Sequence, residues 1–406
     1  MGESPKSAQM IRPRLAATEL PRHCFVSGSE FTTDQEKNTL QGRQDETIKY
    51  KVFAGTWNVG GVAPPDDLDL EDWLDTKTDS YDIYVLGFQE IVPLNARNVL
   101  GPKKTSASMK WNSIIGDALN KRGRRHGEEE AMSGCRQEEG QAPWRWRQEH
   151  EPFGCVVSKQ MVGVFVSVWA RSGLRRHVRH PGASRVGAGV LGRLGNKGAV
   201  TVRFLLHGTS FCFVCCHLAS GGGDGGGALL RNADAAGILS RTSFRGGAPA
   251  PADLPGKILD HDRVVLLGDL NYRIAMDDGE ARQLVRAKKW GMLLENDELL
   301  LELSKGRRFD GWHEGLVTFA PTYKYRPNSD RFYWCTDGAA AAGRDKLHRA
   351  PAWCDRILWR GKGMKQIRYE RCGGYRLSDH RPVRAVFHAV CEITEDVDSV
   401  RSTIHT

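Results

Sequence analysis

Short apolar runs bounded by Gly, Asn, Asp and Pro recur along the chain from Lys51 onward, and they predict β-strands. Most of these runs lack strict alternation of apolar and polar residues, which is typical of strands buried on both faces. The runs are KVFAGTWN (51–58), YDIYVLGFQE (81–90), MVGVFVSVWA (161–170), GAVTVRFLL (198–206), SFCFVCCHL (210–218), RVVLLGDLN (263–271), CDRILW (354–359) and RPVRAVFH (381–388).

Between the strands, Leu, Ile, Ala and Trp recur three or four positions apart around residues 108–120, 228–242 and 278–304, which predicts helices. A sheet whose strands are buried on both faces needs another layer of helices or strands packed on each face. We therefore expect an α/β fold: a four-layer α/β/β/α sandwich with two mixed β-sheets packed face to face and helices outside.

The polar segments predict how the chain is divided. Residues 1–46 show no sustained period and are expected to be a disordered leader, followed by one folded domain over 47–392 and a tail over 393–406. The charge-rich stretch 121–150 and the glycine run at 221–227 are expected to be mobile surface loops. For the basic stretch RSGLRRHVRH (171–180), a solvated connection is favoured over an anion-binding surface.

Composition narrows the class of protein. The 406 residues include 58 Lys and Arg against 49 Asp and Glu, a formal net charge of +9 that fits an anionic headgroup, a membrane surface or nucleic acid. There is no signal-like apolar segment and no run of about 18 apolar residues. We expect a cytosolic protein that contacts membranes reversibly, and the basic run KRGRRH (121–126) leaves a nuclear share open.

Ten cysteines are spread over the chain, and several lie inside apolar runs. The pair Cys212 and Cys215 has the spacing of half a zinc site, but no second pair completes four ligands. We therefore expect these thiols to pack in the core and not to form disulfides or bind zinc.

Polar side chains stand where the predicted strands end, and such groups can converge on one crevice. They are Asn58, Glu90, His217, Asp269 with Asn271, and Asp379 with His380. Each alone is more often a turn residue, because Asp and Asn side chains accept hydrogen bonds from backbone amides. Their repeated occurrence at strand ends favours a functional site.

One Glu, several Asp and Asn oxygens and no Cys-His cluster suit a hard cation such as Mg²⁺. A metal, a carboxylate and histidines are a sufficient set for phosphate ester hydrolysis. The chain has no G-x-S-x-G elbow and no P-loop, and covalent catalysis therefore has no candidate nucleophile of these kinds.

Several blocks of the sequence resemble the signature motifs of inositol polyphosphate 5-phosphatases, members of the endonuclease/exonuclease/phosphatase superfamily. They occur in the family's order: TWNVGG (56–61), GFQEIVPL (87–94), GNKGAV (195–200), CHLASG (216–221), GDLNYRI (268–274), PTYKY (321–325), PAWCDRILW (351–359) and SDHRPV (378–383). PPDDLDLEDWL and EIVPLNARNVLG are most similar to the type I enzymes of plants.

The resemblance implies catalytic roles. Glu90 would bind Mg²⁺ with Asn58 beside it, Asp269 would orient and deprotonate the attacking water, and Asn271 would hold a non-bridging oxygen. His217 and His380 would bind the scissile phosphate, with Asp355 fixing the tautomer of His380. Whether Arg273 and Arg356 support this network or pack structurally is left open.

The resemblance also implies a substrate: the 5-phosphate of phosphoinositide lipids, of soluble inositol polyphosphates, or of both. Tyr323, Lys324 and Arg349 would hold the 4-phosphate, and Asn196 with Lys197 would reach the 1-phosphate. The chain departs from the animal pattern at Leu347, where a Lys is usual, with Lys346 one place earlier.

Two alternative functions remain: a nuclease of the same superfamily, and a catalytically silent phosphoinositide-binding module. We expect a monomer whose partner is the inositol phosphate or phosphoinositide headgroup, with peripheral membrane contact and no nucleic acid.

Overall fold

The computed structural model describes residues 46–93, 105–133, 152–188, 197–221, 227–244, 254–306, 308–333 and 350–393, with 122–133 described by their backbone. The predicted leader up to residue 45, most of the predicted insert, residues 222–226 of the glycine run and the tail after Ile393 lie outside these residues. So do Asn196, Lys346, Leu347 and Arg349.

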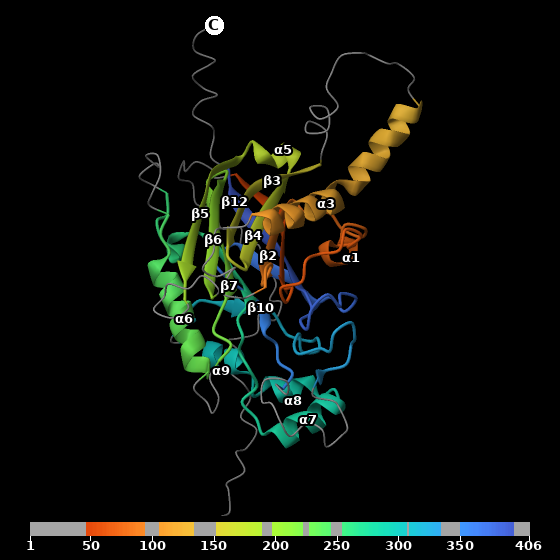
Figure 1. Ribbon diagram of the computed structural model, residues 1–406. Coiled ribbons are helices and arrows are strands. Elements are labelled where there is room, and N and C mark those ends of the chain that lie inside the picture. Colours follow the sequence, from red (N-terminus) through yellow and green to blue (C-terminus); the bar gives the residue numbers. More distant parts are fainter. Residues whose placement is uncertain are drawn as a thin grey trace, which may run out of the picture.

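Twelve described strands form two six-stranded sheets (Figure 1). The first has the order β11 (Met364–Arg371), β12 (Val383–Glu392), β1 (Thr47–Asn58), β2 (Ile83–Gln89), β4 (Val164–Arg171), β3 (Phe153–Met161). The second has the order β5 (Val178–Gly187), β6 (Gly198–Leu206), β7 (Thr209–His217), β8 (Arg263–Asp269), β10 (Asp355–Arg360), β9 (His313–Glu314). Only β1–β2 and β7–β8 are parallel among the described pairs, so both sheets are mixed, as expected.

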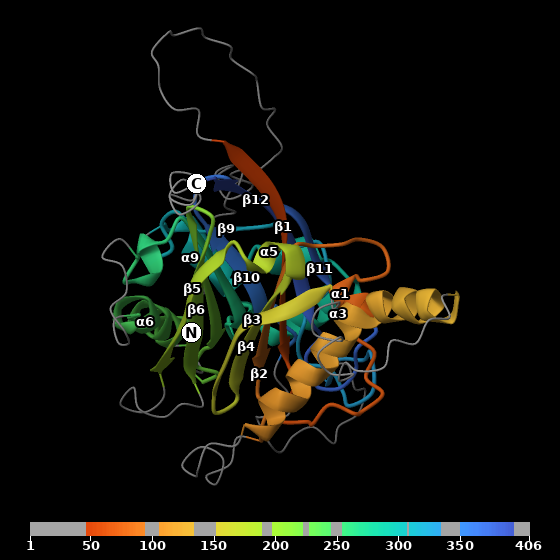
Figure 2. The same ribbon diagram turned by 90° about the horizontal axis from the view of Figure 1, so that it is seen from above.

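Helices lie outside the two sheets (Figure 2). The elements α1 (Glu71–Leu74) and α3 (Ser106–Ser133) lie on the side of the first sheet, and α6 (Gly227–Arg241) and α9 (Glu298–Ser304) on the side of the second. The remaining helices are α5 (Ser172–Arg175), α7 (Asp278–Arg286), α8 (Trp290–Leu294) and a 3-10 turn at Ile258–Asp260. No described helix has the length and apolar character needed to cross a membrane.

Three apolar layers hold these elements together. Aliphatic residues such as Val85 and Val166 pack between the sheets against Phe213 and Leu267. A second layer, rich in Trp, lies between the first sheet and α3, and a third lies between the second sheet and α6. The four-layer α/β/β/α prediction is confirmed, and the seven described cysteines are free, most of them buried.

The two parallel pairs explain why the strand-end residues meet. In β7–β8 the register pairs His217 with Asp269, and in β1–β2 it pairs Asn58 with Gln89. The carboxyl ends of parallel strands share one edge of a sheet, so both sheets deliver polar groups to the same end of the sandwich. At the opposite end, Thr47 pairs with Glu392 in the antiparallel β1–β12 pair.

Gly268 allows strands β7 and β8 to approach closely just before Asp269. Its φ is +145°, and a Cβ there would lie 2.0 Å from the carbonyl oxygen of Cys216 on β7. Only glycine permits this conformation and this close approach of two backbones.

Two charged segments differ from the sequence prediction. Helix α3 continues to Ser133, where we expected a loop from residue 121, because its Lys, Arg, Glu and Ala residues are strong helix formers whatever their charge. The basic stretch 171–180 is not a simple connection, since it forms α5 and begins the edge strand β5.

Candidate active site

Asn58 connects the two sheets at the site. Its Nδ2 donates to Oδ2 of Asp269 at 2.8 Å and lies 3.4 Å from Oε1 of Glu90, while its Oδ1 accepts the Gly60 amide at 3.0 Å. Glu90 has a φ of 55°, in the left-handed region that non-glycine residues rarely adopt and that often marks functional sites. The strand ends thus bring Asn58, Glu90 and Asp269 together, as their positions in the sequence predicted.

His217 lies against the same two carboxylates. Its Nε2 is 3.3 Å from Oδ2 of Asp269 and 3.7 Å from Oε1 of Glu90, and the ring is buried. The ammonium group of Lys197 contacts the same Nε2. Nε2 of His217 therefore faces two carboxylates and one ammonium group. A phosphate or a cation bound here would change the net charge around this nitrogen.

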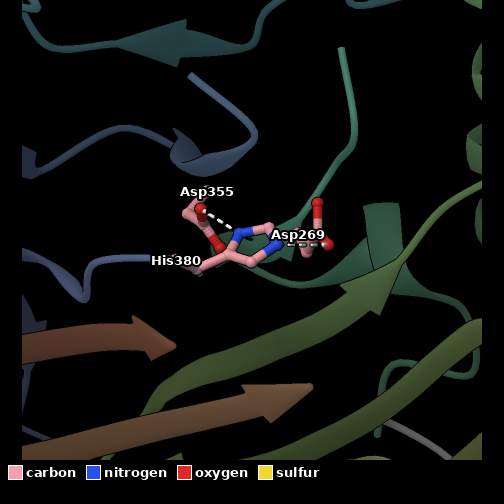
Figure 3. Close-up of side chains that lie close together, drawn as sticks. All are labelled: Asp269, Asp355 and His380. Carbon is pink, nitrogen blue, oxygen red and sulfur yellow. Dashed lines mark hydrogen bonds and ion pairs between the residues drawn. The ribbon is translucent and has the colours of Figure 1, made fainter. Parts of the chain in front are cut away.

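His380 lies between two buried carboxylates (Figure 3). Its Nδ1 is 2.8 Å from Oδ2 of Asp355, and its Nε2 is 4.0 Å from Oδ2 of Asp269. The hydroxyl of Thr322 also donates to Oδ2 of Asp355, at 2.7 Å. Two partners hold this Asp355 oxygen in place, and the carboxylate in turn fixes the imidazole ring with Nε2 toward Asp269.

Asn271 occupies the turn that follows Asp269. Its φ is 58°, its amide donates to Oδ1 of Asp269 at 3.1 Å, and its Nδ2 donates to the carbonyl of Leu218 at 3.1 Å. Arg273 donates to Oδ1 of Asn271 at 2.6 Å. The carboxamide is therefore fixed in one orientation by Arg273, which places this arginine in the network.

The charges of these groups follow from their neighbours. Burial alone would raise the pKa of Asp269, but the hydrogen bond from His217 and the charges of His380 and Lys197 hold that pKa below its ordinary value. Burial opposes charging of His380, yet Asp355 and Asp269 together raise its pKa to about 9. We assign the proton of the His380–Asp355 pair to the imidazole, because Thr322 also stabilises the carboxylate. At neutral pH the site thus pairs an anionic Asp269 with a cationic His380.

Tyr323 and Lys324 lie beside His380 through backbone pairing. Tyr323 forms an antiparallel bridge with His380, and the two rings are 4.5 Å apart. Nζ of Lys324 lies 4.0 Å from Oδ2 of Asp379. Of the predicted phosphate-binding residues, Tyr323, Lys324 and Lys197 are thus at the site, whereas Asn196 and Arg349 are outside the described residues.

Arg356, the other arginine left open by the sequence, points away from the site. Its guanidinium is fully buried and binds Glu314 bidentately at 2.6 and 2.5 Å and Asp297 at 2.9 Å. Tyr369 also donates to Glu314, at 2.8 Å. This ion-pair cluster anchors β10 one residue after Asp355.

Sequence reasoning missed two residues that support the site. Thr322 holds Asp355, and Arg381 is buried and donates to the carbonyls of Ser378 and His380 at 3.0 and 3.2 Å. Thr322 lies inside the block PTYKY and Arg381 inside SDHRPV. Their place in these blocks was the one available signal, because their contacts depend on tertiary pairing.

The donor set fits a hard divalent cation. The carboxylates of Glu90 and Asp269 both lie within hydrogen-bonding range of Asn58, and the Glu90 carboxylate is partly exposed. Ligand atoms of Asp269, Asp355 and His380 also lie within 4.8 Å of one another. His380 and Asp355 already pair with each other, however, and Mg²⁺ prefers oxygen ligands to a histidine nitrogen. The side of Asp269 that faces Glu90 is therefore the better position for such an ion.

Known proteins resemble this chain over most of its length. A model of the endonuclease/exonuclease/phosphatase family 2 matches residues 55–386. The type IV inositol polyphosphate 5-phosphatase 9 of Arabidopsis thaliana is 48% identical over 413 residues, which cover 96% of this chain and 94% of that protein. The type I inositol polyphosphate 5-phosphatase 8 of the same plant is 45% identical, covering 85% of this chain and 72% of that protein. The resemblance to plant enzymes is confirmed and includes type IV as well as type I.

A solved structure is similar as well. The inositol polyphosphate 5-phosphatase domain of SPsynaptojanin, in complex with inositol (1,4)-bisphosphate and a calcium ion, superposes with a TM-score of 0.67 at 29% identity. The match covers 89% of each chain.

Proposed function

The chain belongs to the endonuclease/exonuclease/phosphatase superfamily and, within it, to the inositol polyphosphate 5-phosphatases, and from this premise we propose that it uses Mg²⁺ to release the 5-phosphate by direct in-line attack of water. It is a phosphoric monoester hydrolase. The observation that carries the mechanism is the placement of Asp269 between His217 and His380, within reach of Asn58.

Glu90 is the residue that would hold the metal ion. Its partly exposed carboxylate can offer an oxygen, and Asn58 keeps that carboxylate and Asp269 in place through Nδ2. When bound, a divalent cation neutralises charge on the phosphate and on the leaving oxygen. The calcium ion in the SPsynaptojanin complex supports a divalent site, and the oxygen-rich donor set favours Mg²⁺.

Asp269 would orient the attacking water. Its lowered pKa keeps it ionised at neutral pH, so it accepts a hydrogen bond from water but takes up a proton only when the water oxygen has begun to bond to phosphorus. This suits phosphoryl transfer, whose loose transition state needs little help from a strong base. The backbone amide of Asn271 holds the other Asp269 oxygen in position.

His380 would bind the scissile phosphate as an imidazolium. Its Nδ1 is engaged by Asp355, so Nε2 is the nitrogen left to donate to a phosphate oxygen. Lys197 and His217 add positive and hydrogen-bonding groups on the opposite side of Asp269. These groups receive the charge that develops on the equatorial oxygens.

The substrate would be a phosphatidylinositol phosphate, such as phosphatidylinositol 4,5-bisphosphate, a soluble inositol polyphosphate, such as inositol 1,4,5-trisphosphate, or both. Lys324 and Tyr323 support recognition of the 4-phosphate. Lys197, which the sequence assigned to the 1-phosphate, contacts His217 and would act on the scissile phosphate instead. A net charge of +9 supports reversible contact of a cytosolic monomer with anionic membranes and a role in phosphoinositide signalling.

The test is phosphate release in Mg²⁺ from inositol 1,4,5-trisphosphate and from phosphatidylinositol 4,5-bisphosphate in vesicles, comparing the wild type with Asp269→Asn. We expect release from at least one substrate and a loss of at least about a thousandfold in the variant, with an unchanged circular dichroism spectrum. Comparable activity of the variant, or nicking of supercoiled plasmid at a rate rivalling phosphate release, would overturn the proposal.

A further inference from the structure

A row of alternating cations and tyrosine rings leads outward from the catalytic turn. Cζ of Arg273 lies 4.8 Å from the ring centre of Tyr323, and Nζ of Lys324 lies 5.7 Å from that ring and 5.3 Å from the ring of Tyr333. Cζ of Arg326 lies 5.9 Å from the ring centre of Tyr333. Cations within about 6 Å of an aromatic ring are attracted to it, so the tyrosines hold the three cations in order.

The inner end of the row touches the catalytic machinery. Arg273 donates to Asn271, and the ring of Tyr323 lies 4.5 Å from that of His380. Lys324 comes next and Arg326 is outermost. The row of cations thus begins at the catalytic turn and ends at Arg326.

A short hairpin fixes the outer end. Tyr325 bridges Phe332, the amide of Arg326 donates to the carbonyl of Arg331 at 2.9 Å, and the amide of Tyr333 donates to Lys324 at 3.0 Å. Residue 325 is also hydrogen-bonded through its amide to the carbonyl of residue 379 at 2.9 Å. The hairpin backbone is thus tied to the segment that carries His380, which gives Arg326 a defined place relative to the site.

Arg326 and Lys324 bring two positive charges to one tyrosine ring. Arg326 forms no ion pair with a carboxylate in the part of the chain that the structure describes, and Nζ of Lys324 lies 4.0 Å from Oδ2 of Asp379. Two cations on one ring repel each other, and this repulsion is relieved when an anion binds between them. A phosphate dianion has the charge and the number of acceptor oxygens to do so.

We propose that Arg326, held on Tyr333 beside Lys324, binds a ring phosphate of the substrate that the enzyme does not cleave. This rests on the proposed function and adds a specificity-determining residue to it. An arginine can bind such a phosphate with two parallel hydrogen bonds, whereas a lysine acts as a point charge. The 4-phosphate, next to the scissile group on the ring, is the phosphate that Lys324 and Arg326 would share.

The test compares Arg326→Gln with Arg331→Gln. Arg331 is the matched control, because it lies directly across the hairpin, is exposed, and carries the same charge without a contact to a described ring. KM and kcat are measured on inositol 1,4,5-trisphosphate, and inhibition constants are measured for inositol 1,4-bisphosphate and for inositol 1-phosphate, which lacks the 4-phosphate.

For Arg326→Gln we expect KM for the trisphosphate and the inhibition constant of the bisphosphate to rise about tenfold, because one charge-assisted hydrogen bond is lost. The value of kcat and the inhibition constant of inositol 1-phosphate should stay nearly unchanged. Arg331→Gln should change each value by less than about twofold. Tyr333→Leu should behave like Arg326→Gln, and Tyr333→Phe, which keeps the ring, like the wild type.

Unchanged KM and inhibition constants in Arg326→Gln would overturn the inference. So would equal weakening for inositol 1-phosphate, or equal effects of both arginine variants, because either result indicates general charge attraction. If the wild type released no phosphate, the proposed function would fail by itself. Binding of inositol 1,4-bisphosphate would then be measured by calorimetry, and weaker binding to Arg326→Gln but not to Arg331→Gln would still support the phosphate contact.

Discussion

Asp269 and Asp355 are direct partners across the antiparallel β8–β10 pair, and His380 spans both of their carboxylates. Two buried like charges on adjacent strands repel each other, and a positive charge on the imidazole between them relieves this repulsion. The same imidazole proton would therefore stabilise the pair of acids and bind the phosphate.

This proton predicts an alkaline limit to activity. The carboxylates of Asp355 and Asp269 outweigh burial and raise the pKa of His380 to about 9, so the imidazolium is lost as the pH rises through that value. kcat/KM, which reports the pKa values of the free enzyme, should fall above about pH 9 when measured from pH 6 to 10.5. In Asp355→Asn one of the charges that raise this pKa is removed, so the fall should move to lower pH. If activity fell at the same pH in both proteins, a group other than His380 would be responsible for the fall.

Metal removal should abolish activity reversibly. EDTA is expected to stop phosphate release and added Mg²⁺ to restore it, because a divalent ion neutralises charge on the phosphate and on the leaving oxygen. Glu90→Gln should raise the Mg²⁺ concentration for half-maximal activity by about tenfold or more. Glu280→Gln, an exposed change on α7, is the control. Equal Mg²⁺ requirements in both variants would exclude Glu90 as the ligand.

Gly268→Ala should destabilise the fold. A Cβ at this position meets the Cys216 carbonyl at 2.0 Å with φ at +145°, so β7 and β8 must separate. We expect a loss of at least about 2 kcal/mol in the free energy of unfolding, measured by urea denaturation. Gly291→Ala, where no atom lies within 4 Å of the new Cβ, should change stability by no more than about 1 kcal/mol. Similar midpoints for the two variants would contradict the steric argument.

Arg356→Met should cost about 3–5 kcal/mol of stability, because it leaves Asp297 and Glu314 buried without their counter-ion. Arg360→Met, at the partly exposed end of the same strand, should cost less than about 1 kcal/mol. Thermal unfolding of the two variants separates these expectations. A small effect of Arg356→Met would mean that the two acids take up protons at little cost.

The sequence predicted the eight strands with apolar runs, but not the four edge strands β3, β5, β9 and β11. β5 (VRHPGASRVG) contains Pro and several charges, β11 (MKQIRYER) is mostly polar and charged, β3 (FGCVVSKQM) is half-buried along most of its length, and β9 has only two residues. Edge strands have one free side and tolerate such residues, which hides them from a search for apolar runs. Helix α3 was predicted too short because charge density was taken as a sign of a loop.

At the site, residues at the ends of strands were predictable because parallel pairs place their carboxyl ends together. Connections made across the fold were not. Nothing local reveals that the Asn58 amide joins Glu90 of its own sheet to Asp269 of the other, or that Thr322 reaches Asp355. Such contacts depend on how two sheets and a loop meet, which is decided by packing.

The pairing of Thr47 with Glu392 has a practical consequence for engineering. Strand β1 runs 12 residues from that pair to Asn58, so the first and last strands begin and end side by side roughly 35 Å from the site. A fluorescent protein or an affinity tag joined before Thr47 or after Glu392 would leave the substrate entrance open. A short linker between these two positions would also allow the chain to be circularly permuted, with new termini in a surface turn such as that between β10 and β11.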